Sequence, residues 1–367
     1  MSHDVRSAAT SDASTARTSR RWPAEWEPHA ATWIGWPHHR PDWPGKFEPI
    51  PWVYAEIVRV LHGYERVEIL CHTAEVREEA IRSCEAHGVH LDRCRFHLVP
   101  SDRVWLRDAG PTGVVRADGG VELIAWRFNA WAKYENYASD ELIARSVAQL
   151  AGLPLLEAER PDGGGRLVLE GGGIETDGAG TMLVTEEWLL SDVQVRNPGL
   201  GRADYERAFA EYLGIYRTIW LGEGCVGDDT HGHVDDIARF TDRHTVVLAH
   251  EPDPADDNHA RSADNLRRLE LASRTFEGGL RVVTLPFPRA VVMDGERLPA
   301  SYANFYIANG VVIVPTFNDP NDRVALNTLA ELFPGRAVVG IHAVDLVWGL
   351  GTLHCLTQQQ PAGRGER

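Results

Sequence analysis

Four short segments of the sequence combine chemically reactive side chains with glycine. They span residues 102–111, 170–173, 228–236 and 351–355, and their reactive groups are Asp108, Glu170, His233, Asp235 and Cys355. A cysteine thiolate is a strong nucleophile, and a nearby imidazole supports it. A guanidinium is a planar fork of donors that carboxylates hold in bidentate geometry. The four segments together contain what a hydrolase of a guanidinium group needs: a cysteine, a histidine and at least two acids.

Each segment taken alone also has an ordinary interpretation. The Arg107–Asp108 pair is of the kind that forms surface ion pairs, and Glu170–Gly172 is typical of a tight turn. Cys355 is compatible with a plain core thiol. A different class of function, a metal-dependent hydrolase, would use His231, His233 and Asp235, because residues two apart on a strand share a face. No CxxC, HxxH or HExxH spacing beside these residues supplies the further ligands that a zinc site needs close by, which makes a metal site the weaker alternative.

Composition narrows the class of partner. The 367 residues carry a formal net charge of −16, which disfavours nucleic acid and anionic membranes and is compatible with a small cationic substrate. The sequence contains no run of 18 or more apolar residues, so we expect no transmembrane helix. The cysteines are odd in number and scattered without a CxxC pair, which predicts free thiols in a reducing cytoplasm; they are Cys71, Cys84, Cys94, Cys225 and Cys355.

Short apolar strands alternate with helical periodicity along the chain, which predicts an α/β fold. Helices are expected over residues 52–61, 73–87 and 322–333, and an ordered loop over 22–37. Strands are expected over residues 67–70, 113–115, 167–169, 181–184, 245–249, 282–285 and 311–315. We expect a disordered tail over residues 1–21, a single catalytic domain over 22–361, and a frayed end over 362–367.

Several ordered motifs resemble the agmatine deiminase family, the bacterial-type branch of the guanidine-modifying enzymes that also includes peptidyl-arginine deiminases. The motifs are Pro23-Ala24-Glu25-Trp26-Glu27-Pro28-His29, Trp105-x-Arg107-Asp108-x-Gly110-Pro111, Phe128-Asn129-Ala130-Trp131, Glu170-Gly171-Gly172, Gly232-His233-Val234-Asp235, Pro299-Ala300-Ser301-Tyr302-Ala303-Asn304-Phe305 and His354-Cys355-Leu356-Thr357-Gln358-Gln359-Gln360-Pro361. The resemblance runs from about Trp22 to Pro361. It implies a pseudo-symmetric α/β propeller of five ββαβ-type blades around a central active site.

The resemblance also implies roles for the reactive residues. Cys355 would attack the guanidinium carbon, Asp108 and Asp235 would hold its nitrogens, and His233 would serve as acid and then base, kept protonated by Glu170. The substrate would be agmatine and the product N-carbamoylputrescine, with neither metal nor organic cofactor required. A homo-oligomer is compatible with this reading. Candidate substrate-binding residues are Trp105, Trp36, Trp131, Gly351 and Thr352.

Departures from the family pattern leave the substrate open. The family usually has Gly-Gly-Gly-Asn-Ile-His-Cys where this chain has Gly349-Leu350-Gly351-Thr352-Leu353-His354-Cys355, so Leu350 and Thr352 are expected to line or support the pocket mouth. Peptidyl-arginine and free arginine therefore remain alternative substrates. An Arg or Lys placed for an α-carboxylate would favour free arginine, and a shallow open funnel would favour a peptide. The ionisation of Cys355 before substrate binds is also left open.

Overall fold

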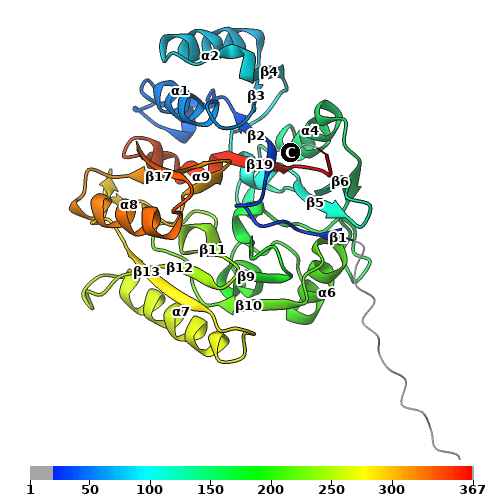
Figure 1. Ribbon diagram of the computed structural model, residues 1–367, viewed down its shortest axis with the longest axis vertical. Coiled ribbons are helices and arrows are strands. Elements are labelled where there is room, and N and C mark those ends of the chain that lie inside the picture. Colours follow the sequence, from blue (N-terminus) through cyan, green and yellow to red (C-terminus); the bar gives the residue numbers. More distant parts are fainter. Residues whose placement is uncertain (1–19, 366–367) are drawn as a thin grey trace, which may run out of the picture.

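One connection pattern recurs five times in the computed structural model, which describes residues 20–365 (Figure 1). In each instance two strands pair antiparallel, and a third strand then pairs parallel with the second. The parallel step follows a stretch of chain that contains at least one helix, as parallel neighbours require, because a tight turn can join only antiparallel strands. The described residues therefore have a mixed α/β fold built from repeated ββαβ units.

The strands form five main sheets and one small hairpin within the described residues. Their bounds, in sheet order, are β19 (Thr357–Pro361), β2 (His29–Gly35), β3 (Val67–Cys71) and β4 (Cys94–Leu98); β1 (Arg20–Arg21), β5 (Thr112–Arg116), β6 (Val121–Ala125) and β7 (Leu155–Glu157); β10 (Arg217–Leu221), β9 (Thr181–Thr185) and β8 (Glu175–Thr176); β11 (Ala238–Asp242), β12 (Thr245–His250) and β13 (Arg281–Pro286); β16 (Tyr306–Ala308), β17 (Val311–Thr316) and β18 (Ala337–His342); and the hairpin β14 (Val292–Met293) with β15 (Glu296–Arg297).

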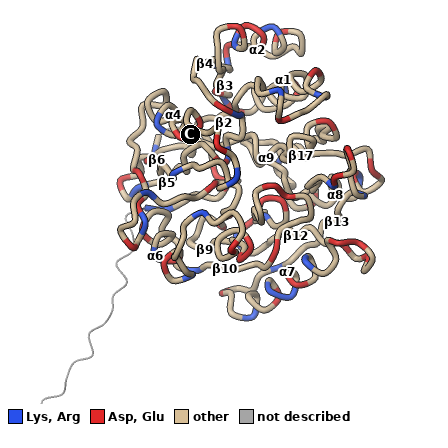
Figure 2. The backbone as a smooth tube through the Cα atoms, turned by 180° about the vertical axis from the view of Figure 1, so that it is seen from behind, with Lys and Arg blue, Asp and Glu red and all other residues tan. Residues whose placement is uncertain are grey.

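The longer helices lie toward the outside of the molecule, and several carry charged residues of both signs (Figures 1 and 2). Local capping fixes where some begin: the Thr73 hydroxyl accepts from the backbone N–H of Val76, and Asp319 caps the helix that starts at Pro320. None of the helices described is both long enough and apolar enough to cross a membrane. Their bounds are α1 (Ile50–Leu61), α2 (Ala74–Ala86), α3 (Leu106–Ala109), α4 (Ile143–Ala151), α5 (Glu186–Leu190), α6 (Arg202–Leu213), α7 (Asn258–Ser273), α8 (Pro320–Leu332) and α9 (Leu353–Leu356).

The central strands of the sheets are buried along nearly their whole length. Every residue of β3 and β9 is buried, and so are all but the last residues of β12 and β17. These strands are rich in apolar residues because helices or neighbouring segments cover both of their faces; the exception within β3 is the buried Glu68, which pairs with Arg66 and His97. The buried apolar side chains form three clusters, the largest around α1, β3 and β17.

One sheet is assembled from segments that lie far apart in the sequence. Strand β19 pairs antiparallel with β2, and the backbone N–H of Ala362 donates to the Pro28 carbonyl at 2.8 Å. Helix α9 leads directly into β19, so this pairing fixes the position of Cys355.

Most of the predicted elements are confirmed, with ends that differ by a few residues. Residues 167–169 are wrong as a strand, since Val168 makes only an isolated bridge with Arg127. The expected loop over 22–37 contains β2, whose residues are mostly buried.

The predicted tails also need correction at their inner ends. Arg20 and Arg21 form β1 against β5, and the Arg364 N–H donates to the Gly119 carbonyl at 2.9 Å, so order extends past both expected boundaries. The rest of the predicted tails, residues 1–19 and 366–367, lies outside the described residues. The assignment of 22–361 as one catalytic domain stays a prediction.

Candidate active site

The site residues occupy the same position in the repeated units: each lies in, or directly beside, the short turn that precedes the first strand of a ββαβ unit. Asp108 is in α3 before β5, and Glu170 precedes the turn before β8. His233 precedes the turn Val234–Asp236 before β11, Asn304 lies just before β16, and Cys355 is in α9 before β19. Because the units repeat the same connection, equivalent turns from five units can meet at one place.

Gly172 marks the point where three of these turns meet. A Cβ atom at Gly172 would lie 2.6 Å from His233 Nδ1, 2.9 Å from Asp108 Oδ1 and 3.1 Å from Asp235 Oδ2. The Gly172 backbone N–H also donates to Asp108 Oδ1 at 3.0 Å. A side chain at this position would collide with all three groups, so glycine is what allows them to converge.

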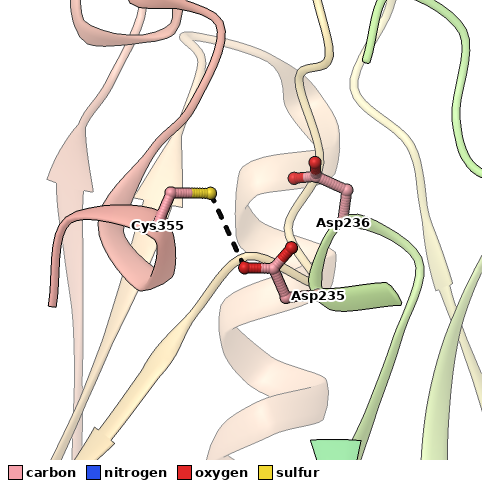
Figure 3. Close-up of side chains that lie close together, drawn as sticks. All are labelled: Asp235, Asp236 and Cys355. Carbon is pink, nitrogen blue, oxygen red and sulfur yellow. Dashed lines mark hydrogen bonds between the residues drawn. The ribbon is translucent and has the colours of Figure 1, made fainter. Parts of the chain in front are cut away.

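The Cys355 thiol is buried and faces carboxylates (Figure 3). Its Sγ lies 3.6 Å from Asp235 Oδ2 and accepts from Asn304 Nδ2 at 3.1 Å. Burial raises the pKa of Cys355 well above its ordinary value, and the nearby charges of Asp235 and Asp236 raise it further. The surrounding protein groups therefore favour the protonated thiol.

The imidazole of His233 lies between two carboxylates. Its Nδ1 is 3.7 Å from Asp108 Oδ1, and its Nε2 is 3.5 Å from Glu170 Oε2, both beyond ordinary hydrogen-bond length. Burial lowers the pKa of His233, but Asp108, Glu170 and Asp235 outweigh it and raise the pKa to about 9. The ring is consequently protonated at neutral pH.

Glu170 is held as a carboxylate by groups behind the histidine. Trp188 Nε1 donates to its Oε2 at 2.6 Å and Arg196 Nε to its Oε1 at 3.1 Å. Burial raises the pKa of Glu170, but Arg196 and His233 oppose burial and bring the pKa down to about 2. The predicted pairing of Glu170 with His233 matches this geometry.

The two aspartates at the site have opposite pKa directions. Burial raises the pKa of Asp108 to about 6, although the charge of His233 lowers it. For Asp235, burial also raises the pKa, but a hydrogen bond to His354 at 2.6 Å and the charge of that ring bring it below the ordinary value. Both carboxylates are nearly inaccessible to solvent, which suits the binding of a cation that displaces water.

A cavity of about 370 Å³ leads to Cys355 and Asp108. Its lining residues are His39, Pro41, Asp42, Pro44, Arg103, Trp105, Asp108, Trp131, Tyr134, Asp229, Thr230, Glu296, Leu298, Trp348, Gly349, Leu350, Gly351 and Cys355. The predicted substrate-binding residues Trp105, Trp131 and Gly351 are thus wall residues. Trp131 Nε1 also donates to Asp108 Oδ2 at 2.8 Å, which fixes that carboxylate.

Two of the predicted substrate-binding residues do not line this cavity. Trp36 is fully buried and packs edge-on against Tyr54, with ring centroids 6.1 Å apart. The Thr352 hydroxyl donates to Asn304 Oδ1 at 2.7 Å, so its role is to support the cysteine turn from behind. Leu350, expected at the mouth, does line the cavity, in a left-handed conformation with φ of 69°.

The metal alternative based on His231, His233 and Asp235 is wrong in its geometry. His231 turns away from the site, with Nε2 2.9 Å from Ser191 Oγ and Nδ1 3.8 Å from Glu187. Among the described residues, the close group of acidic and thiol side chains here is Asp235, Asp236 and Cys355 (Figure 3), and neither histidine belongs to it.

Several residues of the site were not singled out by sequence reasoning. Asn304 contacts Cys355 Sγ and also Asp236 Oδ1, at 3.0 Å. Its signal was its place in the 299–305 motif, which carried no assigned role. Glu25 lies some 330 positions before His354 in the sequence, yet its Oε2 is 2.8 Å from His354 Nε2. No local spacing could have joined those two residues.

Comparison with known proteins places the chain in a family. A profile of the Porphyromonas-type peptidyl-arginine deiminase family matches residues 21–361. The agmatine deiminase of Pseudomonas aeruginosa (strain LESB58) is 34% identical over 368 residues, covering 94% of this chain and 96% of that protein. The agmatine deiminase of Ectopseudomonas mendocina (strain ymp) is 33% identical over 366 residues, with the same coverage.

Solved structures agree with the sequence matches. The agmatine deiminase of Enterococcus faecalis superposes with a TM-score of 0.85 at 29% identity, covering 94% of this chain and 96% of that one. The agmatine deiminase of C. jejuni with substrate bound gives 0.83 at 25% identity, covering 94% and 97%. This chain is therefore an enzyme of the class that hydrolyses guanidino C–N bonds. It belongs to the Porphyromonas-type peptidyl-arginine deiminase family.

Proposed function

We propose that this enzyme deiminates agmatine to N-carbamoylputrescine, with Cys355 as the nucleophile. The observation that carries the proposal is the convergence of Asp108, Asp235 and His233 at Gly172, with the Cys355 thiol against Asp235 and beside a cavity sized for a small molecule. The relatives named above are agmatine deiminases that match nearly the whole chain, which supports this substrate.

In the first stage Cys355 attacks and ammonia leaves. A guanidinium bound between Asp108 and Asp235 offsets the carboxylate charges that raise the pKa of the thiol, so the thiol loses its proton to solvent as the substrate arrives. The sulfur electron pair forms a C–S bond to the guanidinium carbon. His233, protonated at neutral pH, gives its proton to one nitrogen, and that C–N bond breaks with release of ammonia.

In the second stage water replaces the thiol. The amidino-thioether carries a positive charge that Asp108 and Asp235 continue to balance. His233, now neutral, takes a proton from water, whose oxygen forms a bond to the same carbon. The C–S bond then breaks and its electron pair returns to sulfur. The sulfur takes up the remaining hydroxyl proton, and the neutral ureido product leaves. His233 and Cys355 end with the protons they had at the start of the cycle.

The cavity wall favours an ammonium-tailed substrate over free arginine. Asp42, Asp229 and Glu296 are in the lining, whereas Arg103 is engaged: Nη1 and Nη2 donate to Asn136 at 2.9 and 3.0 Å, and Nε lies 3.4 Å from Asp42. Asp42 is paired with Arg103 and Asp229 with Lys133, which leaves Glu296 as the acid that would attract an ammonium, while an α-carboxylate would meet a cation already satisfied by other partners. The near-complete burial of Cys355 also argues for a small substrate over a peptide.

We further infer that the five ββαβ units are the blades of a pseudo-fivefold propeller with the site at its centre. The recurrence of the connection pattern and the common position of the site residues support this arrangement. That the enzyme needs no cofactor, binds no nucleic acid, resides in the cytoplasm and forms a homo-oligomer remain predictions.

A substrate panel tests the proposal. Ammonia and ureido product should both be measured with agmatine, arginine, benzoyl-arginine amide and 4-guanidinobutyrate. We expect agmatine to have the highest kcat/KM and 4-guanidinobutyrate, which carries a carboxylate where agmatine carries an ammonium, to be poor. A preference for arginine or for benzoyl-arginine amide would mean that the proposed substrate is wrong and the proposed reaction is right. No ammonia from any guanidine would refute the reaction itself.

A further inference from the structure

His354, the residue before the nucleophile, lies between two carboxylates on opposite sides of its ring. Nδ1 is 2.6 Å from Asp235 Oδ2 and Nε2 is 2.8 Å from Glu25 Oε2. The side chain is fully buried and does not belong to the cavity lining. A carboxylate oxygen only accepts, so both contacts are hydrogen bonds when both ring nitrogens carry protons. The geometry thus gives each ring nitrogen of His354 a carboxylate acceptor.

Glu25 is a fixed anchor for the far side of this ring. Arg239 Nη2 donates to its Oε1 at 2.7 Å and Arg107 Nη2 donates to its Oε2 at 3.1 Å. The backbone N–H of Ile307 also donates to Oε1, at 2.8 Å. Burial raises the pKa of Glu25, but Arg239, His354 and Arg107 outweigh burial, so the net pKa is well below the ordinary value. Glu25 is therefore ionised and held in one orientation.

We propose that His354 is a positioning residue that keeps Asp235 charged and aimed at the substrate. The ring binds Asp235 through Oδ2 and leaves Oδ1, which is buried and has no hydrogen-bond partner among residues 20–365, for a guanidinium nitrogen. Glu25 in turn holds the ring. The proposal rests on the proposed function only in taking the ligand of Asp235 to be a guanidinium.

Asp236 is an internal comparison for this role. Asp236 follows Asp235 in the chain and is similarly buried, but the group that donates to it is neutral: Asn304 Nδ2 donates to its Oδ1 at 3.0 Å. Burial and the charge of Asp235 raise the pKa of Asp236 well above its ordinary value, whereas that of Asp235 is lowered. The pKa values of two adjacent buried carboxylates thus shift in opposite directions, and the lowered one belongs to the carboxylate that contacts His354.

The sign of the pH effect follows from the groups around the pair. The titratable and charged groups that face Asp235 and His354 are Glu25, Arg107, Asp108, Glu175, His233, Asp236, Arg239 and Cys355. Because His354 lowers the pKa of Asp235, its removal raises that pKa. Asp235 then takes up a proton at a higher pH, and cation binding is lost at a higher pH.

The test is the pH dependence of His354→Gln against a matched control. Without His354, Asp235 should behave like Asp236, so its pKa should rise past the value of about 6 that Asp108 has, and Asp235 should become the group that sets the acid limb. The acid limb of kcat/KM for agmatine should then move up by about one pH unit or more, and the value at neutral pH should fall. His62→Gln, at another buried histidine, whose ring bonds a backbone carbonyl of α1, should lower stability without moving the limb. If His354 had a structural role alone, His354→Gln would lower stability without moving the acid limb, as His62→Gln does.

A second readout does not depend on turnover. Chloroacetamidine is a cation and chloroacetamide is neutral, and in each the Cys355 sulfur displaces chloride and forms a C–S bond. The ratio of the two alkylation rates reports the charge that Asp235 offers. We expect the preference for the cation to weaken in His354→Gln. If the wild-type enzyme releases ammonia from no guanidine, the proposed function fails, and this ratio still decides the role of His354.

Glu25→Gln supplies a second variant in case the first does not fold. The amide oxygen can still accept from His354 Nε2, but the charge is gone, so a smaller shift of the acid limb in the same direction is expected. An unchanged limb and an unchanged alkylation ratio in folded His354→Gln would overturn the proposal. A shift in His354→Gln with none in Glu25→Gln would overturn only the part assigned to Glu25.

Discussion

The two ends of the cavity are built differently. The floor, which we define as Asp108 and Cys355 of the cavity lining together with Glu170, His233 and Asp235 beyond them, comes from turns that occupy the same position in different ββαβ units, and all five side chains are nearly or fully buried. The mouth, defined as His39, Asp42, Asp229, Glu296 and Leu350, is partly or fully exposed. Its residues come from the short helix Arg40–Asp42 and its N-cap, from strand β15 and from the stretches of chain just ahead of His233 and Cys355. The repeated turns thus position the reacting groups, whereas the segments at the mouth determine which substrate can bind.

This difference predicts that floor substitutions change kcat and mouth substitutions change KM. Groups at the floor act on the reacting bonds, whereas groups at the mouth contact parts of the substrate that do not react. The predictions below run from the largest expected effect to the smallest.

Replacing the nucleophile should have the largest effect. Cys355→Ser should reduce ammonia release to the background of the assay, because an alkoxide is far harder to form than a thiolate. The fold should persist, since the change removes little volume. Circular dichroism and steady-state kinetics check both points. Cys225→Ser, a buried cysteine outside the cavity lining, is the matched control and should keep its activity; turnover by Cys355→Ser would remove this residue from the mechanism.

Loss of the proton carrier should come next. His233→Ala should lower kcat by about 10²–10⁴-fold, because one imidazole serves as acid and then as base. Mass spectrometry after a short exposure to agmatine distinguishes the stages: some amidino-thioether on Cys355 would mean that the second stage is the slower. A drop of less than tenfold would assign the proton transfers to another group.

The floor should also give the enzyme a pH-dependent stability. The pKa of His233 is raised to about 9 in the folded protein, above its ordinary value of 6.5, so its stabilising charge interactions are complete below pH 6.5. They should weaken as the pH rises from 6.5 to 9. Urea unfolding at several pH values should show this loss, and His233→Gln should flatten it. An equal slope in both proteins would contradict the assignment.

At the mouth, a charge change should affect binding by a small factor. Asp42 lines the cavity, its Oδ2 has no hydrogen-bond partner among the described residues, and burial raises its pKa to about 6, against the charge of Arg103. Asp42→Asn should raise KM for agmatine about fivefold, the equivalent of about 1 kcal/mol for one partly exposed charge contact, with kcat nearly unchanged. Asp345→Asn, a surface acid paired with Lys46, is the control. A fall confined to kcat would place Asp42 with the floor.

The smallest effect is expected at Leu350. Its φ of 69° costs a leucine about 1 kcal/mol and costs glycine almost nothing. Leu350→Gly should relieve that strain, partly offset by the greater freedom of glycine in the unfolded chain. We expect unfolding free energy to change by less than about 1 kcal/mol and KM to rise slightly as an apolar wall is lost. A large loss of stability would mean that Leu350 packs as a core residue.

The sequence was informative where function depends on local motifs. The reactive members of the floor could be named because each stands beside glycine or in a short recognisable motif. The structure brings Asp108, His233 and Asp235 together at Gly172, with Cys355 against Asp235 and Glu170 against His233. Trp36 could not be separated from Trp105 and Trp131, since tryptophans suit both a core and a pocket wall. The metal alternative failed because His231 and His233 do not lie on a strand; the chain turns between them at Gly232, with φ of 102°.

Contacts between residues far apart in the sequence could not be predicted. Glu25 and His354 meet only because β2 and β19 pair, and a pairing between distant segments leaves no local signature. The repeat of ββαβ units escaped detection for a related reason. The stretches between the second and third strands contain one α-helix in some units and two in another. The number of residues per unit therefore varies, although the order of connection does not.

The pairing of β19 with β2 has a consequence for the time at which the enzyme becomes active. Strand β2 leaves the ribosome early, but its antiparallel neighbour is made only after every other element described here. A growing chain can complete its other sheets, including the turns that carry Asp108 and His233, while it still lacks the nucleophile. With Cys355 as the proposed nucleophile, we expect a chain released before β19 is complete to be inactive, however well the rest of it has folded.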